Sequence, residues 1–212
     1  MQIQDLAPLA TFPFFSKETL KQLENKEQLL NFNLQYWIKN GKIIPIKRGL
    51  YLLKERWEKE ENKEKFLKLL ANKLYEPSYL SLEYIMAKYA LLTEGVYAFT
   101  SITTKKTKTL INDLGRFSYY SLTPKLFTGH TLQKFGSSFI LEAKKEKALF
   151  DYLYLRFLKK TEINQKVITE LRINWENINK SEFKTIKSYA SLSDNPRINK
   201  LIVEIERLHY AL

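Results

Sequence analysis

Side chains able to contact nucleic-acid bases lie close together near the N-terminus. Asparagine and glutamine can form paired hydrogen bonds with an adenine edge, and lysine can reach guanine or a phosphate. The apolar residues among them recur every three or four positions, which places the polar ones on an outer helix face. An ordinary solvated helix also carries polar residues, so the composition of this face is weak evidence by itself. The candidates for base contacts are Asn33, Gln35, Tyr36 and Lys39.

Three basic residues that follow this stretch are candidates for holding a DNA backbone. Lys47 and Arg48 stand directly before Gly49, between two short apolar runs, and Lys42 stands directly before the first run. A basic turn between two strands can meet phosphates or enter a minor groove. We therefore expect Lys42, Lys47 and Arg48 to bind the backbone while the preceding helix contacts the bases.

Three helices must position these side chains. Residues 3–11 are amphipathic, residues 11–15 form a loop, and Ser16 is expected to cap a second helix that ends near Leu23. A third helix is predicted over residues 26–40. Its inward face is formed by apolar residues at spacings of three and four, namely Leu30, Leu34, Trp37 and Ile38.

A two-stranded ribbon is expected after the third helix, which stops at Gly41. Residues 43–46 and 50–52 are apolar and partly β-branched, which favours two β-strands. Gly49 supplies the positive φ that a tight turn between them needs. A helix, a glycine stop and a ribbon with a basic turn, in this order, are typical of a winged helix-turn-helix.

The chain is predicted to contain two domains joined by a charged connector. Residues 54–65 carry mostly charges of both signs and contain no glycine or proline, which is typical of a solvated connector or a helical extension. The expected limits are 1–56 for the winged helix-turn-helix DNA-binding domain, 57–65 for the connector and 66–212 for the second domain.

The second domain is predicted to be α+β. Apolar spacings of three and four indicate its helices, and β-branched and aromatic stretches indicate its strands. We therefore expect a small sheet and C-terminal helices behind the winged helix. The predicted helices cover residues 66–75, 81–95 and 144–160, the strands cover 96–103, 116–122 and 135–142, and residues 161–212 form further helices with a break at 194–196.

The net charge of +12 comes largely from lysine. A lysine-rich solvated surface is the plain interpretation, and a polyanionic partner is the sharper one. The excess of basic over acidic residues is largest between residues 61 and 160, outside the winged helix. Lys105, Lys106 and Lys108 lie in a threonine-rich stretch and form a possible second polyanion contact, although such a run is more often a solvated loop.

Composition and spacing disfavour several other classes of protein. The sequence contains no cysteine, which rules out disulfides and thiolate-bound zinc. The N-terminus lacks the pattern of a signal peptide, and no apolar run approaches the roughly 20 residues of a membrane span. His130 and His209 lie far apart, and no glycine-rich phosphate loop occurs. We expect a cytoplasmic protein with no catalytic residues, no metal, no cofactor and no membrane partner.

A metal-dependent nuclease is the main enzymatic alternative. Such a site needs carboxylates and a lysine near strand ends, and Glu142 and Lys144 follow an apolar stretch, with Asp113 upstream. A Glu-x-Lys triplet is expected often by chance in so lysine-rich a chain, and Asp113 lies in an expected turn. A stand-alone winged-helix transcriptional regulator is a second alternative, and an RNA-binding accessory protein is a third.

Several stretches resemble one known family. Residues 37–51 resemble the winged helix of AbiEi-type antitoxins, from type IV toxin–antitoxin systems. Residues 72–83, with Tyr89–Leu92 and Val96–Ser101, look like the start of the family's C-terminal domain. Gly115–Tyr119 and Ala143–Asp151 follow in the family's order, and the resemblance places Glu142–Lys147 at a helix start. Lys145 stands where many relatives carry proline, and nothing after about residue 161 matches.

The resemblance implies a function in two halves. Proteins of this family bind inverted repeats in the promoter of their own operon through the winged helix and repress it. They also counter a nucleotidyltransferase-like toxin through the C-terminal domain, without requiring a stable complex. The expected partners are therefore double-stranded promoter DNA and such a toxin.

Overall fold

The protein is a mixed α+β molecule whose chain divides into two compact units. A computed structural model describes residues 3–159 and 162–210. The first unit comprises the described residues up to Leu70 together with Leu110–Arg116, and the second comprises Ala71–Thr109 and the described residues from Phe117 onward. The finer limits expected from the sequence, 1–56, 57–65 and 66–212, stay a prediction. No helix in the described ranges is both long and apolar enough to cross a membrane.

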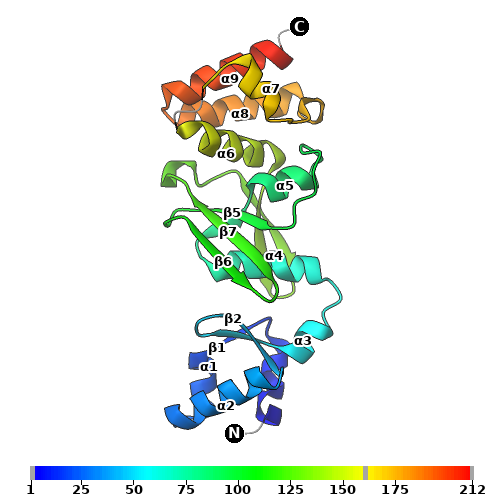
Figure 1. The fold of residues 1–212 in the computed structure, drawn as a ribbon, viewed down its shortest axis with the longest axis vertical. Coiled ribbons are helices and arrows are strands. Elements are labelled where there is room, and N and C mark those ends of the chain that lie inside the picture. Colours follow the sequence, from blue (N-terminus) through cyan, green and yellow to red (C-terminus); the bar gives the residue numbers. More distant parts are fainter. Residues whose placement is uncertain (1–2, 160–161, 211–212) are drawn as a thin grey trace. The chain divides into compact units, whose positions relative to one another are not determined.

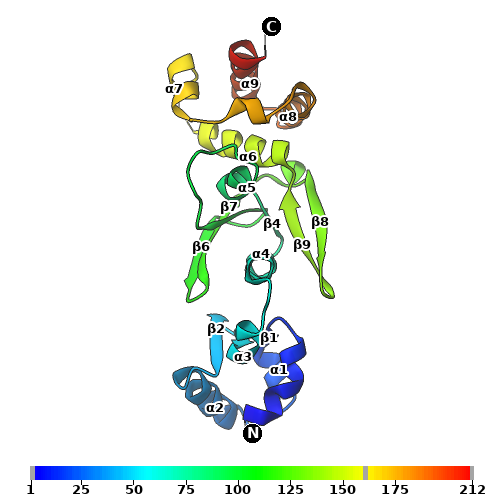
Figure 2. The same cartoon turned by 90° about the vertical axis from the view of Figure 1, so that its right-hand side faces the viewer.

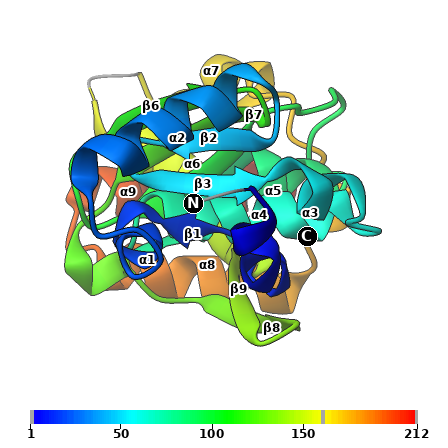
Figure 3. The same cartoon turned by 90° about the horizontal axis from the view of Figure 1, so that it is seen from below.

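The first unit alternates short helices with the strands of a small antiparallel sheet. The strand order is β1-β3-β2, with Phe15 opposite Tyr51 and Ile43 opposite Leu53. Figure 3 shows β3 between its two neighbours, with α2 beside β2. In chain order the elements are η1 (Ile3–Thr11), β1 (Phe15–Ser16), α1 (Lys17–Lys21), α2 (Glu27–Lys39), β2 (Ile43–Lys47), β3 (Leu50–Leu53) and α3 (Lys54–Glu58) (Figure 1).

Local sequence signals account for most of these boundaries. The Oγ atom of Ser16 accepts a hydrogen bond from the Thr19 amide at 3.1 Å, which satisfies a free amide of the first turn of α1. Gly49 adopts a φ of +78° in the β2–β3 turn, as expected for glycine in a tight turn. The predicted three helices and ribbon are confirmed, except that residues 3–11 form a 3-10 helix.

Strand β1 was not expected, because Phe15 was placed in a loop and Ser16 was predicted only as a helix cap. It contains only Phe15 and Ser16, so no alternation of apolar and polar residues can be seen along the sequence. Its backbone becomes a strand because it pairs with β3, whose own residues lie about 35 positions later. A pairing of this kind depends on the tertiary fold.

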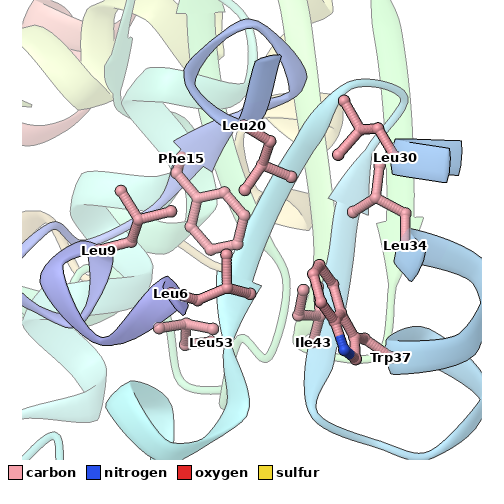
Figure 4. Packing of buried hydrophobic residues seen from close by; sticks show 9 residues of the cluster. All are labelled: Leu6, Leu9, Phe15, Leu20, Leu30, Leu34, Trp37, Ile43 and Leu53. Carbon is pink, nitrogen blue, oxygen red and sulfur yellow. The ribbon is translucent and has the colours of Figure 1, made fainter. Parts of the chain in front are cut away.

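The core of the first unit joins η1, α1, α2 and the sheet. Leu30, Leu34 and Trp37 project from α2 toward Leu20 and Ile43 (Figure 4). Ile38 is only partly buried and packs against this cluster, so all four apolar positions expected on the inward face of α2 are found there. The nine buried members are Leu6, Leu9, Phe15, Leu20, Leu30, Leu34, Trp37, Ile43 and Leu53.

The charged stretch after β3 is helical for its first half. Two ion pairs at i,i+4 spacing support it, because Arg56 lies 2.6 Å from Glu60 and Lys59 lies 2.6 Å from Glu55. The helix α3 ends at Glu58. Residues 63–65 lie in the next helix, so of the two interpretations left open for this stretch the helical one applies to both of its ends.

The second unit is built around a mixed sheet of strand order β6-β7-β5-β4-β9-β8. Strand β4 pairs antiparallel with β5 and parallel with β9, β5 pairs parallel with β7, and β8 pairs antiparallel with β9. The strands are β4 (Ser78–Leu80), β5 (Phe99–Thr103), β6 (Lys108–Asn112), β7 (Gly115–Ser121), β8 (His130–Phe135) and β9 (Ser138–Ala143).

Helices cover this sheet. One of them, α6, packs against α5 on the side of the sheet and against the C-terminal helices on its other side (Figure 2). The predicted break at residues 194–196 is confirmed, since Asn195 caps α9 and Pro196 is its first residue. The helices are α4 (Lys63–Leu74), which crosses the boundary between the units, α5 (Leu82–Lys88), η2 (Pro124–Leu126), α6 (Lys145–Leu158), α7 (Gln165–Glu170), η3 (Trp175–Asn177), α8 (Lys180–Leu192) and α9 (Pro196–His209).

Several boundaries differ from the expected ones. The helix expected over residues 81–95 ends at Lys88, and the strand expected from residue 96 begins at Phe99. Strands β4, β6 and β8 were not expected; β4 is buried along its whole length and too short to show a period. Glu142, placed at a helix start by the family resemblance, lies instead in β9. Helix α6 begins at Lys145, so that placement is corrected by three residues.

Replacing Gly129 with alanine should lower the free energy of unfolding markedly. Its φ is +75°, and an added Cβ would collide with the Tyr189 hydroxyl and come within 2.9 Å of the Lys147 side chain. Overpacking of this kind costs about 1–3 kcal/mol beyond the backbone strain. The matched control is Gly136→Ala, at φ +56° with no described atom within 4 Å of the added Cβ. Equal losses for the two variants in urea unfolding would contradict the close packing at Gly129.

Candidate nucleic-acid interface

The outward face of α2 carries three of the four residues expected to contact bases. Leu34 and Trp37 are buried on the opposite face, whereas Gln35 and Lys39 are exposed and Tyr36 is 57% exposed. Side chains at these positions extend from a helix that its own core fixes in place. This arrangement suits insertion of the outward face into a major groove.

Asn33 lies at the edge of the buried face of α2 and not at the centre of the exposed face. It follows Leu30 by three positions, and its side chain is half-buried. Its Nδ2 atom is shielded from solvent and has no hydrogen-bond partner among the described residues. A buried amide donor normally finds a partner, so this nitrogen marks a place where an acceptor from outside the unit would be favoured. A base contact by Asn33 stays a prediction.

Two apolar residues on the same face were not among the predicted site residues. Phe32 is 66% exposed and Leu29 is 40% exposed, and with Tyr36 they form a second stripe at spacings of three and four. Large apolar side chains gathered on a surface mark an interaction site. The spacing of Leu29 and Phe32 can be read from the sequence, but periodicity alone does not distinguish an exposed apolar stripe from a core-facing one.

The basic residues of the ribbon are also on the surface. Lys47 and Arg48 are exposed at the turn between β2 and β3, and the register of the two strands shifts between Pro45 and Lys47. Lys42 is exposed directly after α2, and its amide donates to the Trp37 carbonyl at 2.8 Å. The first unit therefore presents an outward helix face and three exposed cations on the segment that follows it.

An ion pair ties the start of α2 to α1. The Lys17 Nζ atom lies 2.9 Å from the Glu27 carboxylate, and this hydrogen bond holds the pKa of Glu27 below its usual value. Both groups are accessible to solvent, so the pair contributes little to stability. It connects the first residues of the two helices, while the core cluster holds α2 in place.

The three lysines expected as a second polyanion contact lie between β5 and the start of β6. Lys105 and Lys108 lie above the ring of Tyr75, at 5.5 and 5.4 Å from its centroid. Cation–π contacts of this type favour a defined position for the two ammonium groups. Lys106 is exposed like its neighbours. Two of the three lysines therefore contact an aromatic ring, and all three present their charges to solvent.

A buried ion pair in the second unit was missed entirely. Lys147 and Asp151 lie one turn apart on α6 and have no exposed surface. Lys147 donates to one carboxylate oxygen of Asp151, and the hydroxyls of Tyr79 and Ser81 donate to the other at 2.9 and 2.8 Å. The sequence predicts a helix over residues 144–160 but does not single out either residue. The four side chains connect β4 and the start of α5 to α6.

Burial dominates the titration of this network. It raises the pKa of Asp151 against the opposing effect of its three donors, and it lowers the pKa of Lys147 against the attraction of Asp151. Burial also raises the pKa of Tyr79, whose ring stacks on His130 at 4.8 Å between centroids. The pKa of His130 is lowered by burial and by Lys147. Because these groups are enclosed, the network fits a structural role.

The residues of the nuclease alternative do not come together as a metal site. Glu142 is 1% exposed and accepts hydrogen bonds from Lys88 at 2.7 Å and Gln133 at 2.6 Å. Asp113 lies in the β6–β7 turn and belongs to the first unit. Within residues 3–159 and 162–210, no three carboxylate or histidine side chains are grouped so that they could hold a metal ion.

Breaking the buried pair should destabilise the second unit strongly. Lys147→Met leaves the Asp151 carboxylate without its cation, and such a loss costs about 3–5 kcal/mol. The double variant Lys147→Met, Asp151→Leu should lose less than the single one, because it leaves no uncompensated charge. Lys187→Met, which breaks an exposed 2.8 Å pair with Glu206, is the control and should cost less than about 1 kcal/mol. A Lys147→Met protein as stable as this control in urea unfolding would refute the structural role.

Comparison with known proteins adds no relative to these observations. No family model matches the chain, and no curated protein matches it. The resemblance to AbiEi-type antitoxins therefore stays an expectation based on the stretches described above. The case for a function depends on the geometry of the two units.

Proposed function

We propose that the protein binds double-stranded DNA through a winged helix-turn-helix in its first unit. One observation carries the proposal: α2 has an outward polar and aromatic face and is followed directly by a ribbon with a basic, exposed turn. The order helix, strand, two helices and two strands, with β1 at the edge of the sheet beside β3, supports this interpretation. The assignment of α2 as the recognition helix follows from its exposed face.

Each part of the interface has a separate task. Gln35 and Lys39 contact base edges in the major groove, with Tyr36 and Asn33 at one side of the same face. Lys42, Lys47 and Arg48 bind phosphates and fix the orientation of α2 on the duplex. The base contacts supply specificity, and the phosphate contacts supply a salt-dependent share of the affinity.

We further propose that the protein is a cytoplasmic antitoxin of the type IV class and not an enzyme. The support is the ordered set of AbiEi-like stretches in both units. In this proposal the first unit represses the protein's own operon at promoter inverted repeats. The second unit counters a nucleotidyltransferase-like toxin without a stable complex, and the lysines at 105, 106 and 108 add a second polyanion contact.

Removing the two basic residues of the turn should weaken DNA binding at every sequence alike. Lys47→Ala, Arg48→Ala should lower the affinity for promoter DNA and reduce the slope of log K against log salt by about one unit per lost phosphate contact. The measurement is a fluorescence titration at several salt concentrations. Lys166→Ala, Lys200→Ala removes the same charge from exposed positions of the second unit and serves as the control.

The control should leave both the affinity and the salt slope close to those of the unaltered protein. If the turn variant kept the unaltered salt slope, or if both double variants weakened binding equally, the assignment of the turn to the DNA backbone would fail.

The same turn variant should separate the two halves of the function. In cells that express the proposed nucleotidyltransferase-like toxin, Lys47→Ala, Arg48→Ala should release a promoter reporter from repression and still rescue growth. This follows because toxin neutralisation is assigned to the second unit. Loss of rescue together with repression would overturn the division of tasks. Repression without any rescue by the unaltered protein would identify a stand-alone regulator.

A further inference from the structure

A cavity of about 420 Å³ in the second unit is lined by groups of opposite charge. It lies among the start of α5, the loop before β6, strand β7 and the last turns of α6. Its volume is in the range of small-molecule sites. None of its residues belongs to the proposed DNA interface. The charged and aromatic residues of its lining are Glu83, Tyr120, Tyr152, Arg156 and Lys159.

Glu83 lines this cavity and carries an acceptor atom that has no hydrogen-bond partner in the described part of the chain. This atom, Oε2, is shielded from solvent. A shielded carboxylate oxygen without a donor is unfavourable, and such a group in a cavity indicates a ligand that supplies N–H or O–H donors. The residue is half-buried, so part of it remains accessible from the cavity.

The backbone before Glu83 is held in a strained state. Leu82 has a φ of +59°, which a leucine rarely adopts. Thr100 fixes this segment, because its side chain donates to the Ser81 carbonyl at 2.7 Å and accepts from the Tyr84 amide at 3.1 Å. The Ser81 hydroxyl is bound in turn to Asp151. Strain maintained by surrounding contacts concentrates at ligand sites, where it pre-organises a side chain.

Cations and aromatic rings complete the site. Arg156 is exposed in the last turn of α6 and Lys159 is exposed at its end. Cations at these positions are stabilised by the negative end of the helix dipole. This effect accounts for the two cations, but it does not account for the unsatisfied oxygen of Glu83. Tyr120 is 37% exposed, and burial raises the pKa of Tyr152, with Glu83 adding to the rise and Arg156 opposing it.

We propose that this cavity binds a purine nucleotide whose base presents two adjacent N–H donors, as guanine does. Glu83 accepts both base N–H groups, the tyrosine rings contact the flat base, and Arg156 and Lys159 bind the phosphate. Arg156 can form paired hydrogen bonds with a phosphate group, which places the anion beside this side chain. A base offering only one donor at that edge satisfies Glu83 less completely, so the site prefers guanine over adenine.

Calorimetric titration of the full-length protein with GMP, AMP, guanosine and inorganic phosphate tests the ligand. GMP should bind at least tenfold more tightly than AMP, and both guanosine and phosphate should bind more weakly than GMP, because each has only one of the two recognised parts. The absence of saturable GMP binding up to about 1 mM, a free energy near −4 kcal/mol, would overturn the proposal. Equal affinity for GMP and AMP would overturn the role of Glu83.

Two variants test the residues. Glu83→Gln should remove the preference for GMP over AMP, and Arg156→Gln should weaken GMP and AMP by the same factor without changing guanosine binding. Glu176→Gln and Lys200→Gln, at exposed positions outside this cavity, are the matched controls and should bind as the unaltered protein does. GMP binding that neither Glu83→Gln nor Arg156→Gln alters would place the nucleotide elsewhere and refute this site.

Discussion

The second unit depends most on the hydrogen bonds that the buried carboxylate of Asp151 accepts. This carboxylate is fully buried and receives hydrogen bonds from Lys147 on its own helix, from Tyr79 in β4 and from Ser81 before α5. A buried charge is tolerated only when such partners compensate it, so the three elements cannot separate without exposing it uncompensated. The Lys147 ammonium also lies over the rings of Tyr79 and Tyr189, which draws α8 toward the same centre.

This network also supports the cavity beside Glu83. Ser81 links Asp151 to the strained Leu82, and Thr100 holds the same segment from β5. The backbone position of Glu83 is therefore set by a chain of hydrogen bonds that starts in the core. A structural ion pair and a candidate ligand site are coupled here through three consecutive residues.

In the first unit, α2 has an apolar face that packs in the core and an outward face that is available for the proposed DNA binding. Its inward residues meet Leu20, Ile43 and the rest of the core (Figure 4), and its outward face combines Gln35 and Lys39 with exposed aromatic side chains. The turn after β2 adds exposed cations on the segment that follows. Proposed DNA binding uses this division of faces, while the larger basic excess lies in the residues of the second unit.

The sequence by itself determined the features that depend on neighbouring residues. The period of α2, the Ser16 cap and the glycine turn at 49 are local, so their positions could be predicted before any tertiary contact was known. Other features depend on contacts between residues up to about 70 positions apart. They are strands β1 and β4, the burial of Lys147 with Asp151, and the shielding of the unsatisfied Glu83 oxygen. Only the tertiary structure decided them, because whether a polar side chain is buried, paired or exposed is set by what packs against it.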